Sequence, residues 1–582
     1  MKLTSVHSLM LLVGLGAALP LQAQNQSYNQ IAPKPVQPQK PGAEIAPSPK
    51  PSGISGNSNE VLVHKLKALV FVPTPQAVEI SGAKANGPIV FKKVTVPDET
   101  SFRSLVTPYV GQKLTRGRLN TLIDSIVIYY RQHDRPVIDV IVPEQDITGG
   151  VIQLVLLEGK VGKVTVTGTR WFSPNEIRDD ISAQPGDEIR QSQMQDDLDW
   201  ANNNPFHSSD MVYHPGQKLG ETDIVLETRD RFPARFYAGY EDSGNAQTGF
   251  DRYLAGINWG DAFHLGLGQQ LNYQYTTSGD GDSLRAHSGS YIIPLPWHHT
   301  LTFFGSYVDT KGSIPPLIGL TGRSYQISGR YDIPLPSFTK YYKHTFGFGF
   351  DYKYDKSSLE FGGVPAANTL YDVDQFVLTY SGAETDPCGQ TTISDQLYIS
   401  PGNWGGNNND AAFGVAHTGA TSDYVYNTLV LERLTKLPED FTLILRGTLQ
   451  TSNANLAPSE QLGFGGYDTV RGYDEREVNS DDGYIFTTEL RTPSIGLGEL
   501  CGWHGFNDQL QFLGFWDYGA ASNHAPLPGE PNEVPLSSVG FGLRYTINTY
   551  VSVRYDYGFQ LLRTGLDKDQ GSRSDLGIVV SY

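Results

Sequence analysis

Apolar and polar residues alternate along most of the chain between Phe232 and Tyr582. In residues 545–559 the odd positions carry Tyr, Ile, Thr, Val, Val, Tyr, Tyr and Phe, while the even positions include Thr, Asn, Ser, Arg, Asp and Gly. Similar alternation occurs in 265–275, 346–354 and 541–545. Successive side chains of a β-strand point to opposite faces, so this period of two predicts strands with one apolar, aromatic face and one polar face.

A soluble β-sandwich would also alternate, but two features favour a transmembrane β-barrel. Charged residues and glycines occupy the polar face on strand after strand, as in a water-filled lumen, and aromatic residues gather near strand ends, as in an interfacial girdle. About 350 residues shared among about 16 strands leave about 22 for each strand and connection, enough for the roughly 10 that a tilted spanning strand requires. Short connections at 261–264, 294–300, 437–440 and 548–549 alternate with long ones at 400–422 and 452–482. The sequence therefore predicts a barrel of about sixteen antiparallel strands over 232–582.

Two small α/β units are predicted upstream of the barrel, at 69–159 and 160–231. In the first, apolar residues at helical spacing predict a buried helix face within 118–133, carried by Leu119, Leu122, Ile123, Ile126 and Tyr130. The other predicted elements are strands at 137–142, 151–157, 163–167 and 223–227, a helix capped at Ser173 by a capping box with Glu176, and a helix at 191–202. Small sheets of this kind have free edges, and a free edge can pair with an extended peptide.

The N-terminus reads as a targeting segment followed by a linker. Residues 1–23 combine Lys2 with an apolar run at 9–21, as in a secretory signal peptide. Residues 24–68 are a linker that is rich in Pro, Gln, Ser and Gly and shows no apolar periodicity over 24–59. This linker is either a plain spacer or a tether that enters the pore.

Charge and cysteine content narrow the function classes. The chain has 44 basic and 62 acidic side chains, a net charge of -18, which argues against nucleic acid as a partner. The two cysteines, Cys388 and Cys501, form either one disulfide or two separate thiols. No cofactor is expected: His298-His299 lacks the helical spacing of a zinc site, and 463–466 lacks the Lys of a phosphate-binding loop. We therefore predict that the chain is not an enzyme.

Two motifs carry a resemblance to a known family. Residues 142–159 read VPEQDITGGVIQLVLLEG, with Pro143, Gln145, Gly150, Glu158 and Gly159 at matching places. The second motif is Val470-Arg471-Gly472-Tyr473, followed by Phe515-Trp516-Asp517-Tyr518-Gly519. With these motifs the chain resembles the outer-membrane transporters of two-partner (type V) secretion, the TpsB-type hemolysin and adhesin secretion proteins. It departs from the family at 134–136, where a Gly-Tyr pair is usual, and at the last residue, Tyr582. The most important departure is in residues 24–59, which show no amphipathic helix of the kind that some members place inside the barrel as a plug.

The resemblance implies a mainly β fold, a 16-stranded antiparallel transmembrane barrel preceded by two periplasmic POTRA domains. It implies that the loop at 452–482 enters the lumen and that Arg471 reaches Asp517, with Phe515 and Gly519 on the same strand face. It also implies a function, which is to secrete an unfolded, β-helical exoprotein through the barrel, with outer-membrane lipid around the barrel and a monomer as the expected state. An outer-membrane protein insertase of the same superfamily remains the alternative. A passive porin is a weaker one, because porins lack periplasmic α/β units.

Overall fold

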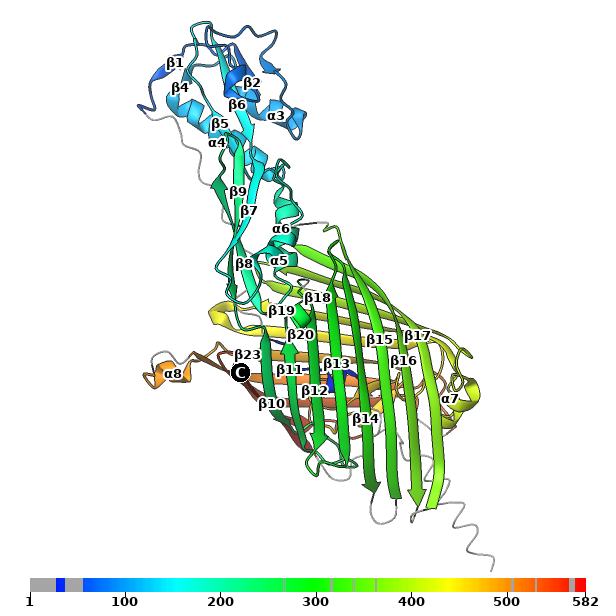
Figure 1. Ribbon diagram of the computed structural model, residues 1–582. Coiled ribbons are helices and arrows are strands. Elements are labelled where there is room, and N and C mark those ends of the chain that lie inside the picture. Colours follow the sequence, from blue (N-terminus) through cyan, green and yellow to red (C-terminus); the bar gives the residue numbers. More distant parts are fainter. Residues whose placement is uncertain are drawn as a thin grey trace, which may run out of the picture. The chain divides into compact units, whose positions relative to one another are not determined.

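The computed structural model describes residues 28–36, 45, 56–264, 266, 268–314, 318–337, 339, 341–361, 364–503, 507–528, 531–564 and 571–582 (Figure 1). The predicted signal peptide lies outside these residues. The chain divides into two compact units. One lies within Pro38–Pro233, and the other combines Ala234–Tyr582 with the described part of Met1–Gln37.

The first α/β domain is a four-stranded sheet covered by two helices. The strands lie in the order β3-β2-β6-β5, in which β2 and β6 are parallel and β5 is antiparallel to β6. The elements are β2 (Ala68–Val72), β3 (Ile89–Phe91), α3 (Glu99–Val106), α4 (Arg116–Gln132), β5 (Ile138–Ile141) and β6 (Val151–Glu158). The core lies between the helices and the sheet and includes Leu69, Phe71, Phe102, Leu122, Ile126, Tyr130 and Leu154.

Both helices of this domain begin at a residue whose side chain caps free backbone N–H groups. Asp98 accepts hydrogen bonds from the N–H groups of Thr100 and Ser101, and Thr115 accepts one from that of Arg118. Such caps stabilise a helix start by about 1 kcal/mol. Helix α4 confirms the helix predicted from the apolar spacing, since the five residues that predicted it are all buried.

The second α/β domain is a three-stranded sheet with two helices. Its strands lie in the order β7-β9-β8, with elements β7 (Lys160–Thr167), α5 (Pro174–Asp179), α6 (Gln191–Ala201), β8 (His207–Pro215) and β9 (Glu221–Asp230). Strand β8 was not predicted. Ser173 does precede α5, but its side chain makes no capping hydrogen bond, so the predicted capping box is wrong.

Part of the predicted linker is folded. Strand β1 (Val61–Val63) pairs with β4 (Leu114–Thr115), and β2 begins at Ala68, so the α/β fold starts before the predicted linker ends at residue 68. Val63 and Leu66 are buried in the core of the first domain. These few apolar residues were assigned to the linker because they directly follow the Pro-rich residues 24–59.

Sixteen antiparallel strands form a closed barrel, which confirms the predicted fold (Figure 1). They are β10 (Ala234–Glu241), β11 (Arg252–Trp259), β12 (Gln270–Ser278), β13 (Leu284–Pro294), β14 (Thr300–Ile314), β15 (Ile318–Leu335), β16 (Tyr342–Phe361), β17 (Val364–Asp386), β18 (Gly389–Pro401), β19 (Asp423–Lys436), β20 (Thr442–Ser452), β23 (Asp482–Arg491), β24 (Asp508–Ser522), β25 (Val534–Ile547), β26 (Val551–Gln560) and β27 (Ser572–Ser581). The first strand pairs with the last, Tyr240 opposite Ile578, so the ring has no free edge.

The two faces of the barrel strands differ as the alternation predicts. On β16, Phe346 and Phe348 point outward and are 37% and 48% exposed, whereas Asp351 points inward and is 1% exposed. An apolar outer face and a polar inner face are what a transmembrane barrel needs. Among the described residues, no helix is long and apolar enough to cross a membrane.

The connection between β20 and β23 is the lumen loop, residues 453–481. The end of the barrel at which this loop leaves the wall is called the loop end. The loop contains a small hairpin of β21 (Leu462–Phe464) and β22 (Val478–Ser480). We call 453–461 the base of the loop and 465–477 its tip.

Candidate functional site in the barrel lumen

The hairpin and the tip of the lumen loop pack against the inner wall of the barrel through a small apolar cluster. Phe464, Val470, Tyr473 and Val478 of the loop are buried against Ile485 of β23, Ala521 of β24 and Leu536 of β25. A Cβ atom added to Gly519 on β24 would lie 3.0 Å from side-chain atoms of both Phe464 and Val470. The last position of the Phe515–Gly519 motif therefore stays small so that the loop can pack closely against β24.

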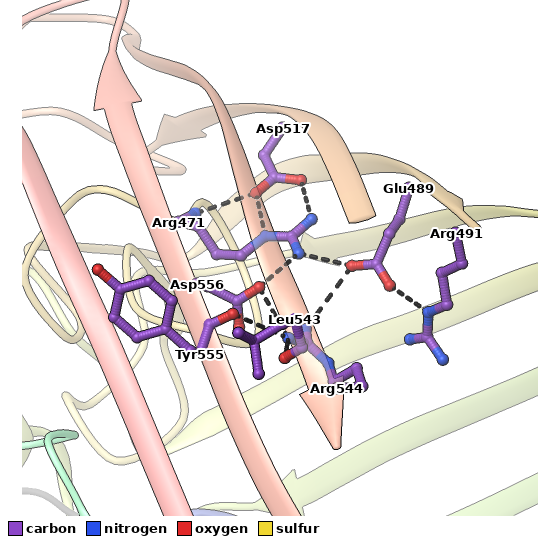
Figure 2. A network of polar contacts seen from close by, with 8 residues as sticks. All are labelled: Arg471, Glu489, Arg491, Asp517, Leu543, Arg544, Tyr555 and Asp556. Carbon is purple, nitrogen blue, oxygen red and sulfur yellow. Dashed lines mark hydrogen bonds and ion pairs between the residues drawn. The ribbon is translucent and has the colours of Figure 1, made fainter. Parts of the chain in front are cut away.

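Arg471 is held in the lumen by carboxylates from three strands, as Figure 2 shows. Its Nε and Nη2 atoms donate to the two oxygens of Asp517 on β24, at 2.8 and 2.9 Å, and its backbone N–H donates to Asp517 at 3.1 Å. Its Nη1 atom donates to Glu489 on β23 at 2.6 Å and lies 3.5 Å from Asp556 on β26. The structure thus brings Arg471 and Asp517 together, in the two-bond geometry that suits a guanidinium and a carboxylate.

Charges within this cluster are balanced. Arg544 on β25 donates to Asp556 at 3.0 Å, and Arg491 on β23 donates to Glu489 at 2.6 Å. With Arg471, these make three guanidinium groups facing the three carboxylates (Figure 2). The Arg471 guanidinium also lies over the Phe515 ring, 3.6 Å from its centroid. Arg471 and Asp517 are 5% and 0% exposed, so removal of one partner would leave an uncompensated buried charge.

Gly472 and Tyr473 bring the loop backbone against β25 and β26. Gly472 has φ +91°, and an added Cβ atom would lie 2.9 Å from backbone atoms of Gly558 on β26. Only glycine adopts this conformation without strain and allows so close an approach. The Tyr473 hydroxyl lies 2.9 Å from the carbonyl oxygen of Ser537 and accepts a hydrogen bond from the Ser537 N–H at 3.1 Å.

The N-terminal segment, residues 28–36, also lies in the lumen and begins with the short helix α2 (Tyr28–Ile31). The Ile31 carbonyl oxygen accepts hydrogen bonds from Gln274 on β12 at 3.1 Å and Ser288 on β13 at 2.5 Å. Lys34 forms an ion pair with Glu241 on β10 at 2.7 Å. Gln30 donates to Glu475 in the tip at 3.3 Å. Within this part of the linker, the structure thus favours the alternative in which the chain enters the pore.

Comparisons with known proteins identify the family. The family model described as haemolysin secretion/activation protein ShlB/FhaC/HecB matches residues 220–545, more than half of the chain, and the ShlB-type POTRA domain model matches 88–159. The chain belongs to this family.

Two curated relatives match most of the chain. The heme/hemopexin transporter protein HuxB of Haemophilus influenzae is 22% identical over 482 residues, which cover 77% of this chain and 79% of the relative. The outer membrane transporter CdiB of Dickeya dadantii is 22% identical and covers 75% of this chain and 76% of its own length.

Solved structures agree on the fold. CdiB from Escherichia coli superposes with a TM-score of 0.72 at 16% identity, over 93% of this chain and 94% of that chain. CdiB from Acinetobacter baumannii gives a TM-score of 0.62 at 16% identity, over 95% of both chains. By this family the chain is a two-partner secretion barrel of the outer membrane, with its POTRA domain in the periplasm.

In the first α/β domain, the POTRA signature residues near the β5–β6 turn hold this turn in shape. Gln145 donates to the carbonyl oxygens of Pro143 and Gln153, at 3.2 and 2.8 Å, and accepts from the Gln153 N–H at 2.7 Å. Gly150 has φ +80°. These contacts fix the turn, and they account for this part of the signature by structure alone.

Glu158 and Gly159 end β6. Glu158 lies 3.3 Å from Arg135, and burial raises the pKa of Glu158 while the Arg135 charge lowers it in part. A Cβ atom on Gly159 would lie 2.6 Å from the Val137 side chain. These residues therefore position the end of β6 against the chain that enters β5.

Cys388 and Cys501 are both exposed and unbonded. Cys388 lies in the β17–β18 turn and Cys501 at the end of α8 (Leu497–Leu500), in the connection between β23 and β24. The disulfide, one of the two alternatives left open by the sequence, is therefore wrong.

Sequence reasoning missed Glu489, Asp556 and Arg544. The alternation of apolar and polar residues does place Asp556 on the polar face of its strand, between Tyr555 and Tyr557. It does not show which polar residues of different strands meet at one height in the lumen, because that depends on the register of the closed barrel.

Proposed function

We propose that this protein recognises an unfolded exoprotein in the periplasm through its POTRA domains and secretes it through the barrel to the cell surface. The client would be the secreted partner of a two-partner system, a β-helical protein with its own signal peptide. The observation that carries this proposal is the content of the lumen. Residues 28–36 are seated there on hydrogen bonds that can be exchanged for others, beside a loop tip that Arg471 holds against the barrel wall.

The first POTRA domain offers an edge for an extended client segment. Strand β5 ends the sheet and, among the described strands, pairs only with β6. Ile138 and Val140 on β5 face the core, whereas Asp139 is exposed. An edge of this kind binds a peptide by adding a strand, with backbone hydrogen bonds that do not depend on the client sequence.

Secretion is tested by co-expressing the protein with a candidate client, a large β-helical exoprotein with its own signal peptide sought among the neighbouring genes, and measuring this client in the medium. Deletion of 469–475 removes Arg471 and its neighbours, so we expect client to accumulate inside the cell and to be lost from the medium. The assembly of unrelated outer-membrane barrels is measured in the same cells. Undiminished secretion would contradict the role of the loop, and a general loss of barrels would favour the insertase alternative.

Client recognition is tested by placing a photo-reactive amino acid at Asp139 on the β5 edge. The matched control is Asp124, an exposed aspartate on α4 of the same domain. We expect the client to cross-link at position 139 and not at 124. Equal cross-linking at both positions would contradict strand addition at this edge.

A further inference from the structure

A second buried ion pair fixes the base of the lumen loop. Lys353 on β16 donates to both carboxylate oxygens of Glu460, at 2.8 and 3.0 Å. Gln375 on β17 and Tyr426 on β19 also donate to Glu460, at 2.9 and 2.8 Å. The Glu460 side chain is fully buried. The base is therefore attached to β16, β17 and β19, whereas Arg471 of the tip is bonded to β23 and β24.

The two attachments lie on opposite walls. In the ring of sixteen strands, β16 is the seventh and β26 the fifteenth, so eight places, half of the ring, separate them. Lys353 on β16 holds the base, while Asp556 on β26 belongs to the cluster that holds the tip. The lumen loop therefore crosses the barrel from one wall to the other.

A cavity of about 320 Å³ remains between the N-terminal segment and the wall formed by β14–β18. Tyr28 and Asn29 line one side, and Arg330, Asp351, Lys353 and Tyr398 are among the residues on the other. The lining extends along the wall from Ser381, which opposes Thr345, to the row in which Gln326 opposes Lys353. The lining is mainly polar, so the cavity suits water and an extended polypeptide.

Lys353 is the last residue of β16 that lines this cavity. Because β16 and β20 run in the same direction, Lys353 marks the limit of the cavity that faces the loop end of the barrel. Beyond it lies a buried apolar cluster that joins the loop base to the wall. Leu456 and Ala457 of the base pack there with Tyr371, Val373, Tyr424 and Phe413, the last on helix α7 (Asp410–Ala416). The cavity thus ends at the Lys353–Glu460 pair.

We propose that the loop base is the gate of a conduit along β14–β18, and that the Lys353–Glu460 pair is the latch that keeps this gate closed. The tip stays fixed by Arg471 while the base swings away from β16 and β17. Glu460 and Lys353 are positioning residues in this scheme. It rests on the proposed function only for the claim that the conduit carries a polypeptide.

The gate is tested by ion conductance, which needs no client. The purified full-length protein is inserted into planar lipid bilayers, with KCl as the permeant probe. Glu460→Gln keeps the shape of the side chain and removes its charge, and Lys353→Met removes the cation. We expect either change to raise the time spent in the conducting state roughly tenfold, the ratio that corresponds to about 1.4 kcal/mol.

Asp309→Asn is the matched control, because Asp309 pairs with Arg323 at 2.9 Å but on the exposed outer face of β14 and β15. Heat-modifiable migration of each variant shows that its barrel has folded. Folded Glu460 and Lys353 variants that keep the wild-type conductance, whether that is high or absent, would overturn the proposal.

A covalent latch gives the opposite test. Cysteines replace Lys353 and Glu460 in a chain whose Cys388 and Cys501 are serine, and a short bis-maleimide joins them. We expect the joined protein to stay closed and the unjoined pair to conduct. Conductance that is unaffected by the cross-link would show that the base does not move. If the latch behaves as expected but no client is secreted by the wild type, the proposed function fails and the gate stands.

Discussion

The loop tip and the N-terminal segment share the barrel lumen, but they are held there in different ways. Arg471 in the tip is almost fully buried and faces three carboxylates, whose charge it balances together with two further arginines. Lys34 in the N-terminal segment makes one ion pair and keeps 22% of its side chain exposed. The other contacts of that segment are mainly neutral hydrogen bonds, two of them to the backbone oxygen of Ile31.

This difference has an energetic consequence. A buried charge cannot leave its partners without a large desolvation and pairing cost, whereas a neutral hydrogen bond that is exchanged for one to water changes the free energy by only about 1 kcal/mol. The tip is therefore a fixed part of the wall, and residues 28–36 are an occupant that can be displaced. Three substitutions test this comparison.

Arg471→Ala should have the largest effect. It leaves Asp517 and Asp556 buried without their shared cation, so we expect the free energy of unfolding to fall by about 3–5 kcal/mol. Urea unfolding of the purified barrel in detergent measures this. Arg471→Lys keeps the charge but not the two-bond geometry, and it should give an intermediate value. A barrel as stable as wild type would mean that the cluster does not hold the tip.

Gly472→Ala should come next. The added Cβ atom would occupy a left-handed backbone conformation and meet the backbone of Gly558, so we expect a loss of about 1–3 kcal/mol. Gly447→Ala on β20 is the control, because a Cβ atom there meets nothing within 4 Å. The same urea experiment applies, and equal effects at the two positions would show that the close approach of loop and wall is unimportant.

Lys34→Ala should have the smallest effect on stability. Its ion pair with Glu241 is partly exposed and isolated, so we expect a loss of about 1 kcal/mol or less. Hydrogen exchange of residues 28–36 should nevertheless increase, because the segment leaves its seat more often. If Lys34→Ala destabilised the barrel as much as Arg471→Ala, the distinction between a fixed tip and a displaceable segment would be lost.

The same difference explains what the sequence could predict. The alternation over 232–582 predicts the barrel because burial against lipid imposes a period of two on every strand. The four residues from Val470 to Tyr473 are recognisable because their chemistry is specific: an arginine fork, a left-handed glycine and a bonded hydroxyl. The seat of residues 28–36 was not predicted, since hydrogen bonds to a backbone oxygen require no particular residue there.

Other features depend on register. Glu489, Asp556 and Arg544 join Arg471 only because the stagger of the closed barrel brings β23, β25 and β26 to one height. Glu460 and Lys353 are 107 residues apart and meet because the base of the lumen loop folds across to β16. Strand β8 and the folded end of the linker were missed because their apolar patterns are short or lie among polar residues.

A double-mutant cycle on Arg471 and Asp517 tests the central claim most directly. The free energy of unfolding is measured by urea for Arg471→Ala, for Asp517→Ala and for the double variant. Arg471→Ala should cost about 3–5 kcal/mol, because it leaves Asp517 buried and unpaired. Asp517→Ala should cost less, about 1.5–3 kcal/mol, because Arg471 keeps its contacts with Glu489 and Asp556. The double variant should cost little more than Arg471→Ala alone, giving a coupling energy of roughly 1.5–3 kcal/mol. Additive costs would contradict the claim that Arg471 binds Asp517 inside the barrel.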